Sequence, residues 1–377
     1  MALLVFGNGF DKACGLESSF PEYLKSRYYS STLEKCKDVI AYIKDNGAKY
    51  GDAMPTIDPW YNGFSKVTFW DIYFSKPHLI KMSEREIELW SDFETTLNSF
   101  IMGIKNSWNE WRNDILTSRW SDIVNYPSNE DMLFSLALRL YLAHRTEQED
   151  IEKVSHKTLA ALLLEDLKDY EKRFGEYIRE QQAHKKDYLT NAEKWIKALR
   201  GGDTLEYLNT FNYSDLSSLL PSKAGLWHVN GDADTPIFGI DYDAEETGAY
   251  DPWYIFTKTY RRLELNGSKV CYPTNRSFRK VIVYGHSLNK QDYNYFFALF
   301  NRLKLNKERD EKNGYSIVFA FNEYGGRSIE DVKREKVDGV LRMMQAYNKQ
   351  VLHAPDFRLM DILYCNNAIR FQPVSIR

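Results

Sequence analysis

Four short polar stretches, each placed directly after a run of apolar residues, carry the groups in this chain that could do chemistry. They are Gly7-Asn8-Gly9, Asn212, His228 with Asn230, and Gly285-His286-Ser287. A histidine titrates near neutral pH and can act as a general acid or base, and amide and hydroxyl groups position a substrate or a water. Glycines allow a ligand to approach the backbone closely. These residue types, taken together, indicate one shared ligand site.

The apolar runs before these stretches predict the strands of a parallel sheet. Ala2 to Phe6 is apolar without alternation, which is typical of a strand buried on both faces. The other predicted strands are Leu205 to Phe211, Leu226 to Val229, Lys280 to Tyr284, Tyr315 to Ala320 and a short edge strand at Ile362 to Tyr364. Helical patterns at Tyr293 to Leu303 and Glu335 to Asn348 indicate βαβ units, whose ligands bind beyond the carboxyl ends of the strands. All four polar stretches would meet there.

The turn after the first strand has the features of a phosphate site. From Phe10 the pattern is helical, so Gly7-Asn8-Gly9 lies at a helix N-terminus, where free N–H groups and the helix dipole favour an anion. The third glycine of the usual dinucleotide fingerprint is absent. An ordinary strand-to-helix turn is the alternative interpretation, and a structural role is the alternative for His228 and for Asn212. His286 is the second candidate for a working histidine.

A long helical stretch separates the first strand from the second. Its helical segments are residues 20 to 44, 83 to 117, 129 to 145 and 148 to 199. Residues 49 to 80, rich in glycine, proline and aromatic residues, predict an ordered loop region that would serve as a lid. We therefore expect an α/β fold with a mostly parallel sheet and a large helical insertion after the first strand. The sheet domain would comprise residues 1–20 and 201–377, and the insertion subdomain residues 21–200.

Carboxylates and cysteines give little indication of a metal site. Asp92 and Glu94 lie two residues apart on a predicted helix and point in different directions, so solvated side chains are favoured over an acid–base pair. The chain contains no C-x-x-C pair, which disfavours a zinc module and a disulfide framework. The four cysteines are Cys14, Cys36, Cys271 and Cys365. We expect buried thiols and no bound metal.

Composition excludes several classes of protein. A net charge of −3 gives no long-range attraction to nucleic acid. No apolar run reaches the roughly 18 residues that a membrane span needs, and the first run is too short for a signal sequence. We therefore expect a cytoplasmic protein that binds neither membrane nor nucleic acid. Aromatic residues form 15% of the chain, and core packing is favoured for them over a contact surface.

A set of motifs spanning most of the chain makes it recognisable. They are Gly7-Asn8-Gly9-Phe10-Asp11, Gly15 to Phe20, Trp90 to Glu94, Thr210 to Tyr213, His228 before Gly231, and Gly285-His286-Ser287-Leu288 followed by Asp292. Through them the chain resembles the AbiH family of bacterial abortive-infection, or phage-defence, proteins. A fainter likeness to sirtuin-like NAD-binding domains implies a Rossmann-like nucleotide-binding sheet. Sirtuin deacetylases carry a four-cysteine zinc module that this chain lacks, so deacetylation is disfavoured.

The resemblance implies a phage-defence effector that hydrolyses NAD at the nicotinamide–ribose bond, with NAD as substrate and no required cofactor. Asn212 would orient the ribose or the attacking water, and His228 would be the general base. The implied ligand-binding residues are Gly7, Asn8 and Gly9 for the pyrophosphate, Asp11 for a ribose hydroxyl, Ser287 for the adenosine ribose and Asp292 for fixing the Ser287 loop.

Two other functions remain open. The pocket would serve equally in a nucleotide-sensing binding module without turnover. A metal-dependent nuclease would use Asp11, Asp92 and Glu94, although no close pair of these carboxylates has the spacing of metal ligands. The helical insertion is expected to cap the pocket and to provide a self-association surface, giving a homo-oligomer.

Overall fold

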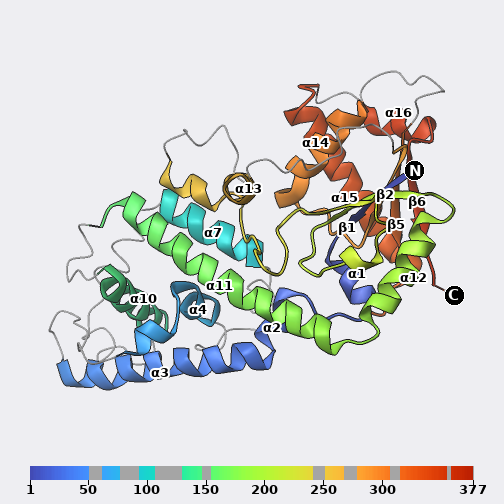
Figure 1. Cartoon of the computed structure of the whole chain (residues 1–377). Coiled ribbons are helices and arrows are strands. Elements are labelled where there is room, and N and C mark those ends of the chain that lie inside the picture. The colour runs from blue at the N-terminus through green and yellow to red at the C-terminus, as the bar shows by residue number, and fades with distance from the viewer. Residues whose placement is uncertain are drawn as a thin grey trace. The chain divides into compact units, whose positions relative to one another are not determined.

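Six strands form one sheet in which every neighbouring pair runs parallel, in the order β3-β2-β1-β4-β5-β6 (Figure 1). The strands are β1 (Ala2–Phe6), β2 (Leu205–Thr210), β3 (Gly225–His228), β4 (Lys280–Tyr284), β5 (Ser316–Phe321) and β6 (Ile369–Pro373). This is the strand order of the Rossmann fold. The predicted α/β fold with a Rossmann-like sheet is confirmed, and the sheet is parallel throughout.

The structure is a computed structural model. It describes residues 1–50, 62–76, 93–106, 130–146, 154–240, 251–266, 278–305, 315–354 and 358–376. The chain divides into two units. The sheet unit comprises Met1–Ser18, Ile178–Pro236 and Asn266–Arg377, and the helical unit comprises Ser19–Tyr177 and Ile237–Leu265. Within the described ranges, no helix has a stretch long and apolar enough to cross a membrane.

Helices cover both faces of the sheet. Those of the sheet unit are α1 (Asn8–Ala13), α12 (Tyr188–Arg200), α14 (Tyr293–Leu303), α15 (Ile329–Gln350) and α16 (Leu359–Cys365). In β1, Leu3 and Val5 pack with α14, α15 and α16, whereas Ala2, Leu4 and Phe6 pack with α1 and α12. Because both faces of β1 are buried, the strand has no polar alternation.

The predicted edge strand at Ile362 to Tyr364 is wrong. These residues belong to α16, in which Leu359 and Leu363 are buried while Ile362 and Tyr364 are exposed. The four-residue spacing of the buried leucines is typical of an amphipathic helix. A short apolar run in the sequence fits either a helix or a strand, so the two could not be told apart. The edge strand is β6, whose alternation is weak because only Ile369 is fully buried.

The helical unit is built from α2 (Phe20–Leu24), α3 (Arg27–Tyr50), α4 (Phe69–Phe74), α7 (Phe93–Asn106), α10 (Glu130–Thr146), most of α11 (His156–His184) and α13 (Lys258–Asn266). Short 3-10 helices lie at Gly63–Lys66, Ser217–Leu219, Pro252–Phe256 and Lys290–Asp292. The first predicted helical segment, residues 20 to 44, forms the pair α2 and α3, and α3 continues through Gly47 to Tyr50. A single glycine weakens a helix by only about 1 kcal/mol, so packing outweighs it.

Part of the predicted loop region forms α4, whose aromatic side chains are buried. Phe69, Trp70 and Phe74 are inaccessible or nearly so, and Phe64 before them is also buried. Core packing of these aromatic residues is therefore confirmed. Trp60 and Tyr61, which belong to the same predicted loop, lie outside the described residues, as does the capping pattern that begins at Ser83.

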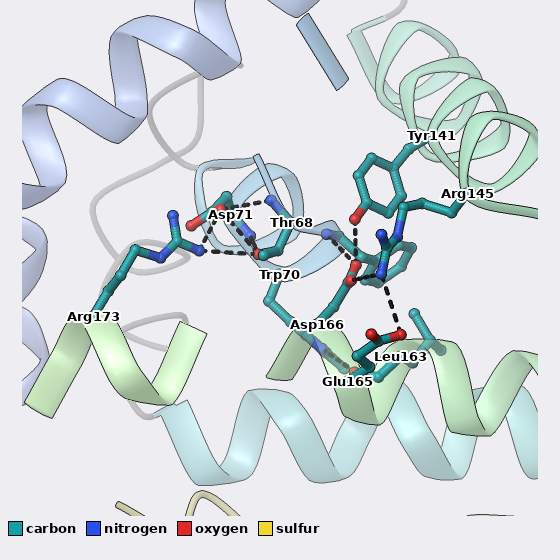
Figure 2. A network of polar contacts seen from close by, with 10 residues as sticks. Thr68, Trp70, Asp71, Tyr141, Arg145, Leu163, Glu165, Asp166 and Arg173 are labelled. Atoms are coloured by element: carbon teal, nitrogen blue, oxygen red, sulfur yellow. Dashed lines mark hydrogen bonds and ion pairs between the residues drawn. The ribbon is translucent and has the colours of Figure 1, made fainter. Parts of the chain in front are cut away.

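A buried polar network fixes the start of α4 (Figure 2). Oδ2 of Asp71 accepts hydrogen bonds from the backbone N–H of Thr68 at 2.7 Å and from Nη2 of Arg173 at 2.6 Å. Asp166 accepts the N–H of Phe69 at 2.8 Å. The other donors in the network are Tyr141 and Arg145, both to Asp166, and Trp70 to the carbonyl of Leu163. Since Asp166, Leu163 and Arg173 belong to α11, the network attaches α4 to that helix.

Candidate functional site

The four predicted polar stretches follow strand ends that lie side by side. Phe6 of β1 pairs with Thr210 of β2 and with Tyr284 of β4, and Thr210 pairs with His228 of β3. All of these strands point the same way, so their carboxyl ends lie along one edge of the sheet, which we call the carboxyl edge. The predicted convergence of the stretches at one edge is confirmed, and the order of the strands reverses there between β1 and β4.

Asn212 connects the end of β1 to His228. Its side-chain Nδ2 donates to the carbonyl of Gly7 at 3.1 Å, and its backbone N–H donates to Oγ1 of Thr210 at 3.0 Å. Its backbone carbonyl lies 2.9 Å from Nδ1 of His228. A carbonyl oxygen only accepts, so Nδ1 carries the proton and Nε2 of the neutral ring holds the lone pair. His228 is half-buried, and Nε2 makes no hydrogen bond to the described part of the chain.

A carboxylate close to His228 was not anticipated from the sequence. Oδ1 of Asp232 accepts hydrogen bonds from the N–H of Asp234 and the N–H of Thr235, both at 3.0 Å. Partial burial alone would raise the pKa of Asp232, but these hydrogen bonds, helped by the nearby His228, outweigh burial and lower the pKa. Asp232 therefore carries a negative charge near the ring of His228.

His286, the other candidate, is a packed histidine. Its Nδ1 accepts the backbone N–H of Leu288 at 2.9 Å, and its Nε2 lies 3.4 Å from Oδ2 of Asp292. The ring is 4% exposed and stands edge-on to Phe211, with 4.3 Å between ring centroids. Both nitrogens thus have partners and the side chain is closed to a ligand. Of the two histidines, His228 has a ring nitrogen, Nε2, without a hydrogen bond to the described residues, and its role as a base stays a prediction.

The glycines of the first turn are required by the packing of two backbones. The N–H of Gly7 donates to the carbonyl of Tyr284 at 3.0 Å, and the N–H of Gly9 donates to that of Gly285 at 2.8 Å. A Cβ on Gly7 would lie 2.5 Å from Cα of His286, and one on Gly9 would lie 2.8 Å from Cα of Gly285. Close approach of β1 and β4 thus accounts for both glycines, and their role as phosphate ligands stays a prediction.

We expect the Gly285→Ala variant to be clearly less stable than wild type. The new Cβ would lie 2.3 Å from the backbone N of Phe10, and φ at this position is +70°. Overpacking of this kind costs about 1–3 kcal/mol or more, in addition to about 1–2 kcal/mol for the left-handed backbone. Gly325→Ala is the matched control, since φ there is +58° with nothing described within 4 Å of the new Cβ. Equal losses of unfolding free energy in urea would contradict the packing role of Gly285.

Asp11 is enclosed within the sheet unit. Its side chain is 0% exposed, and Oδ1 accepts hydrogen bonds from the hydroxyls of Tyr188 at 2.7 Å and Ser214 at 2.9 Å. Oδ2 has no hydrogen-bond partner in the part of the chain that the structure describes. Burial raises the pKa of Asp11 to about 6, against the opposing effect of these hydrogen bonds. Asp11 therefore holds α1, α12 and the segment after β2 together, and its contact with a ribose stays a prediction.

Asp11 is expected to make stability fall as pH rises from 4 to 7. Its pKa is about 6 in the folded protein against an ordinary value of 3.8, so the folded protein binds the proton more tightly than the unfolded chain does. The stabilisation is complete below pH 4 and is lost through pH 6, a change of roughly 3 kcal/mol at 1.36 kcal/mol for each pH unit. Wild type should therefore lose about this much free energy of unfolding relative to Asp11→Asn over that range.

Urea titrations at several pH values measure this difference. Asp338→Asn, at an exposed position on α15, is the control and should show no such trend. If the difference between wild type and Asp11→Asn is the same at pH 4 and pH 7, Asp11 does not titrate as described.

The remaining predicted ligand-binding residues lie on the same edge but differ in their surroundings. Ser287 is exposed, and the side chain of Asn8, also exposed, accepts the hydroxyl of Ser18 through Oδ1 at 2.8 Å. Asp292 is mostly buried against His286, which fits the expected role of fixing this loop. No ligand contact of Asn8, Ser287 or Asp292 is tested by this arrangement, so all three remain predictions.

The carboxylates considered for a metal are Asp11, described above, and Asp92 and Glu94. Oε1 of Glu94 lies 2.7 Å from Nζ of Lys258, which is 4% exposed, so Glu94 is already paired with a cation. Asp92 lies outside the described residues. Among the residues that were described, no group of three or more histidine, cysteine or acidic side chains is arranged to hold a metal ion. Cys14 and Cys36 are buried, as expected, whereas Cys365 is exposed.

Comparison with known proteins gives one match. The family described as Bacteriophage abortive infection AbiH matches residues 3–310, from β1 to beyond α14. Comparisons with curated proteins and with solved structures found no match. The matched residues include the glycine turn, Asn212, His228 and the Gly285-His286-Ser287 loop, and they make up most of the chain. The chain therefore belongs to the AbiH family and has a role in bacteriophage abortive infection.

Proposed function

We propose that this AbiH protein acts in abortive infection by hydrolysing NAD at the nicotinamide–ribose bond. The observation that carries the proposal is the arrangement of His228 at the carboxyl edge. Its Nδ1 is fixed on the carbonyl of Asn212, and its Nε2 is left for a substrate or a water. The strand order of the sheet supports a dinucleotide as the ligand, because such sheets bind dinucleotides where the order of the strands reverses.

The reaction needs few groups from the protein. The oxygen of a water attacks C1′ of the ribose, the C1′–N bond breaks, and nicotinamide leaves with the electron pair as a neutral molecule. Nε2 of His228 accepts the proton that the water loses. Asp232 then stabilises the resulting imidazolium, and the carbonyl of Asn212 keeps the ring in the required orientation. ADP-ribose is the second product, and the proton passes from the histidine to solvent.

Incubation of the purified protein with NAD, followed by chromatography for nicotinamide and ADP-ribose, tests the proposal. The incubation is repeated with lysate from phage-infected cells, because an abortive-infection effector is expected to need a trigger. Formation of both products in equal amounts supports hydrolysis. A rise in melting temperature with NAD but no product in either incubation would favour the nucleotide-sensing module instead. The absence of both product and melting shift would overturn the nucleotide proposal as a whole.

Self-association belongs to the same proposal. It is supported by α13 in the helical unit, which exposes Leu263 and Leu265 at 67% and 43%. Light scattering over a concentration series, with and without NAD, measures the oligomeric state. A strict monomer at micromolar concentration in both conditions would remove this part of the proposal.

A further inference from the structure

Lys336 on α15 is a shielded cation at the carboxyl edge. The helix begins after Ser328 and follows β5, and helical side chains tilt toward the helix N-terminus, which directs Lys336 back toward that edge. Its Nζ donates to the carbonyl of His286 at 2.7 Å, directly after β4. The side chain is only 12% exposed.

The charge on Lys336 is poorly compensated by its neighbours. Among the described residues, the nearest carboxylate oxygen is Oε1 of Glu335, 4.0 Å away. The other oxygen of Glu335 is taken by Arg327 and by the hydroxyl of Tyr324. Burial lowers the pKa of Lys336, and Glu335 offsets this only in part. An ammonium has three N–H donors, and the described part of the chain uses one, at a carbonyl. A shielded ammonium with unused donors is suited to bind an anion.

A series of short contacts links Lys336 to His228 along the carboxyl edge. Nζ of Lys336 touches the carbonyl of His286, and the backbone of His286 lies against Gly7. The carbonyl of Gly7 accepts Nδ2 of Asn212, whose own carbonyl holds His228. The contacts thus run without a break from the end of β4 across β1 and β2 to β3.

The structure also argues against phosphate binding by the turn Gly7-Asn8-Gly9 alone. The N–H groups of Gly7 and Gly9 are both committed to carbonyls of the β4 segment. We propose that Lys336 binds a phosphate group of the ligand at the end of β4. The ligand class is a phosphate-bearing nucleotide, and the inference that this nucleotide is NAD rests on the proposed function. Lys336 lies outside the residues matched by the AbiH family, so the family match does not assign it.

Calorimetry with inorganic pyrophosphate and with ADP, on the full-length protein, tests the role of Lys336. A charge-assisted hydrogen bond is worth about 1.5–3 kcal/mol, so Lys336→Met should weaken ADP binding by roughly 10- to 100-fold. Lys336→Arg keeps the charge and should retain more of the affinity. Lys333→Met, at an exposed position on the same helix, is the matched control and should change affinity less than about twofold. Melting curves confirm that each variant is folded.

Each outcome supports or overturns the proposed role of Lys336. Unchanged ADP affinity in a folded Lys336→Met variant overturns the inference, and so does a wild type that binds neither ADP nor pyrophosphate. If Lys336→Met does not fold, Lys336→Gln replaces it, and failure of both to fold would make Lys336 a purely structural residue. A wild type that binds ADP through Lys336 but does not cleave NAD would overturn the hydrolysis proposal and leave this inference standing. Cleavage of NAD by the Lys336→Met variant with an unchanged KM for NAD would support the hydrolysis proposal and overturn this inference.

Discussion

His228→Ala is expected to lower the rate of NAD hydrolysis by roughly 10²- to 10⁴-fold, the usual contribution of a general base. The reason is the loss of Nε2, the ring nitrogen that is left to accept a proton when Nδ1 is held by the carbonyl of Asn212. Because His228 is half-buried and makes one hydrogen bond to the described chain, its removal should leave the melting temperature nearly unchanged. Product formation and thermal melting, measured on the same preparation, provide both readings.

Two further variants separate catalysis from structure. His228→Asn has an amide that can still donate to the carbonyl of Asn212 but has no basic nitrogen, so it should be as inactive as His228→Ala. His286→Ala should show the opposite pattern, a lowered melting temperature, because that ring is buried and both of its nitrogens are engaged. Turnover at the wild-type rate in His228→Asn would show that His228 is not the base.

Asp232→Asn completes this series with a smaller effect. The negative charge near His228 stabilises the imidazolium that forms during proton transfer, so its removal should slow NAD hydrolysis. A merely structural role for Asp232 would lower the melting temperature and leave the rate unchanged. Product formation and thermal melting of Asp232→Asn therefore test whether Asp232 acts through His228.

The sheet and its carboxyl edge were accessible from the sequence because their signals are local. Ala2 to Phe6 and Lys280 to Tyr284 are continuous apolar runs ended by glycine, and they form β1 and β4 within the predicted limits. The parallel arrangement followed from alternating strand and helix patterns, and it placed Asn212 and His228 at one edge. The contact between these two residues spans only 16 positions of sequence, which is short enough for a motif to indicate it.

The supporting contacts could not be predicted because they join distant parts of the chain. Tyr188 is 177 positions from Asp11, and nothing in the pattern of α12 marks its hydroxyl as a partner for a carboxylate. Lys336 follows Glu335 on a highly charged helix, a pattern that normally indicates solvated side chains. The sequence places Gly285 in a polar stretch after a strand, but its packing against Gly9 depends on the spacing of two strands. In each case, the tertiary contact rather than the residue type carries the information.

Which segments belong to the helical unit also depends on contacts between distant parts of the chain. Ile237–Leu265 was expected in the sheet domain, since it lies between β3 and β4, yet it belongs to the helical unit. A buried ion pair joins this segment to α11. Arg261 makes two hydrogen bonds to Glu171, at 3.0 and 2.7 Å, and Glu171 also accepts the N–H of Phe238 at 2.6 Å. The partners are 90 positions apart, so their pairing left no local pattern.

Breaking this ion pair is expected to give the largest loss of stability in the helical unit. The side chains of Glu171 and Arg261 are 3% and 2% exposed, so each would be a buried charge that has lost its main partner. Arg261 would keep only the more exposed Glu264, whose Oε2 lies 3.9 Å from its Nε. Removing one partner of such a pair typically costs about 3–5 kcal/mol. We therefore expect a loss of this size in Glu171→Leu and in Arg261→Met. The double variant should be much closer to wild type, because two apolar side chains of similar volume can replace a buried pair.

A double-mutant cycle, measured by urea unfolding, gives the coupling energy between the two residues. The control is Lys168→Ala, which breaks an exposed ion pair between the same helices, 2.8 Å from Glu264. Exposed pairs contribute about 0–1 kcal/mol, so this variant should differ little from wild type. Losses that simply add in the double variant, or a Lys168→Ala variant as unstable as Glu171→Leu, would show that the buried pair does not hold Ile237–Leu265 in the helical unit.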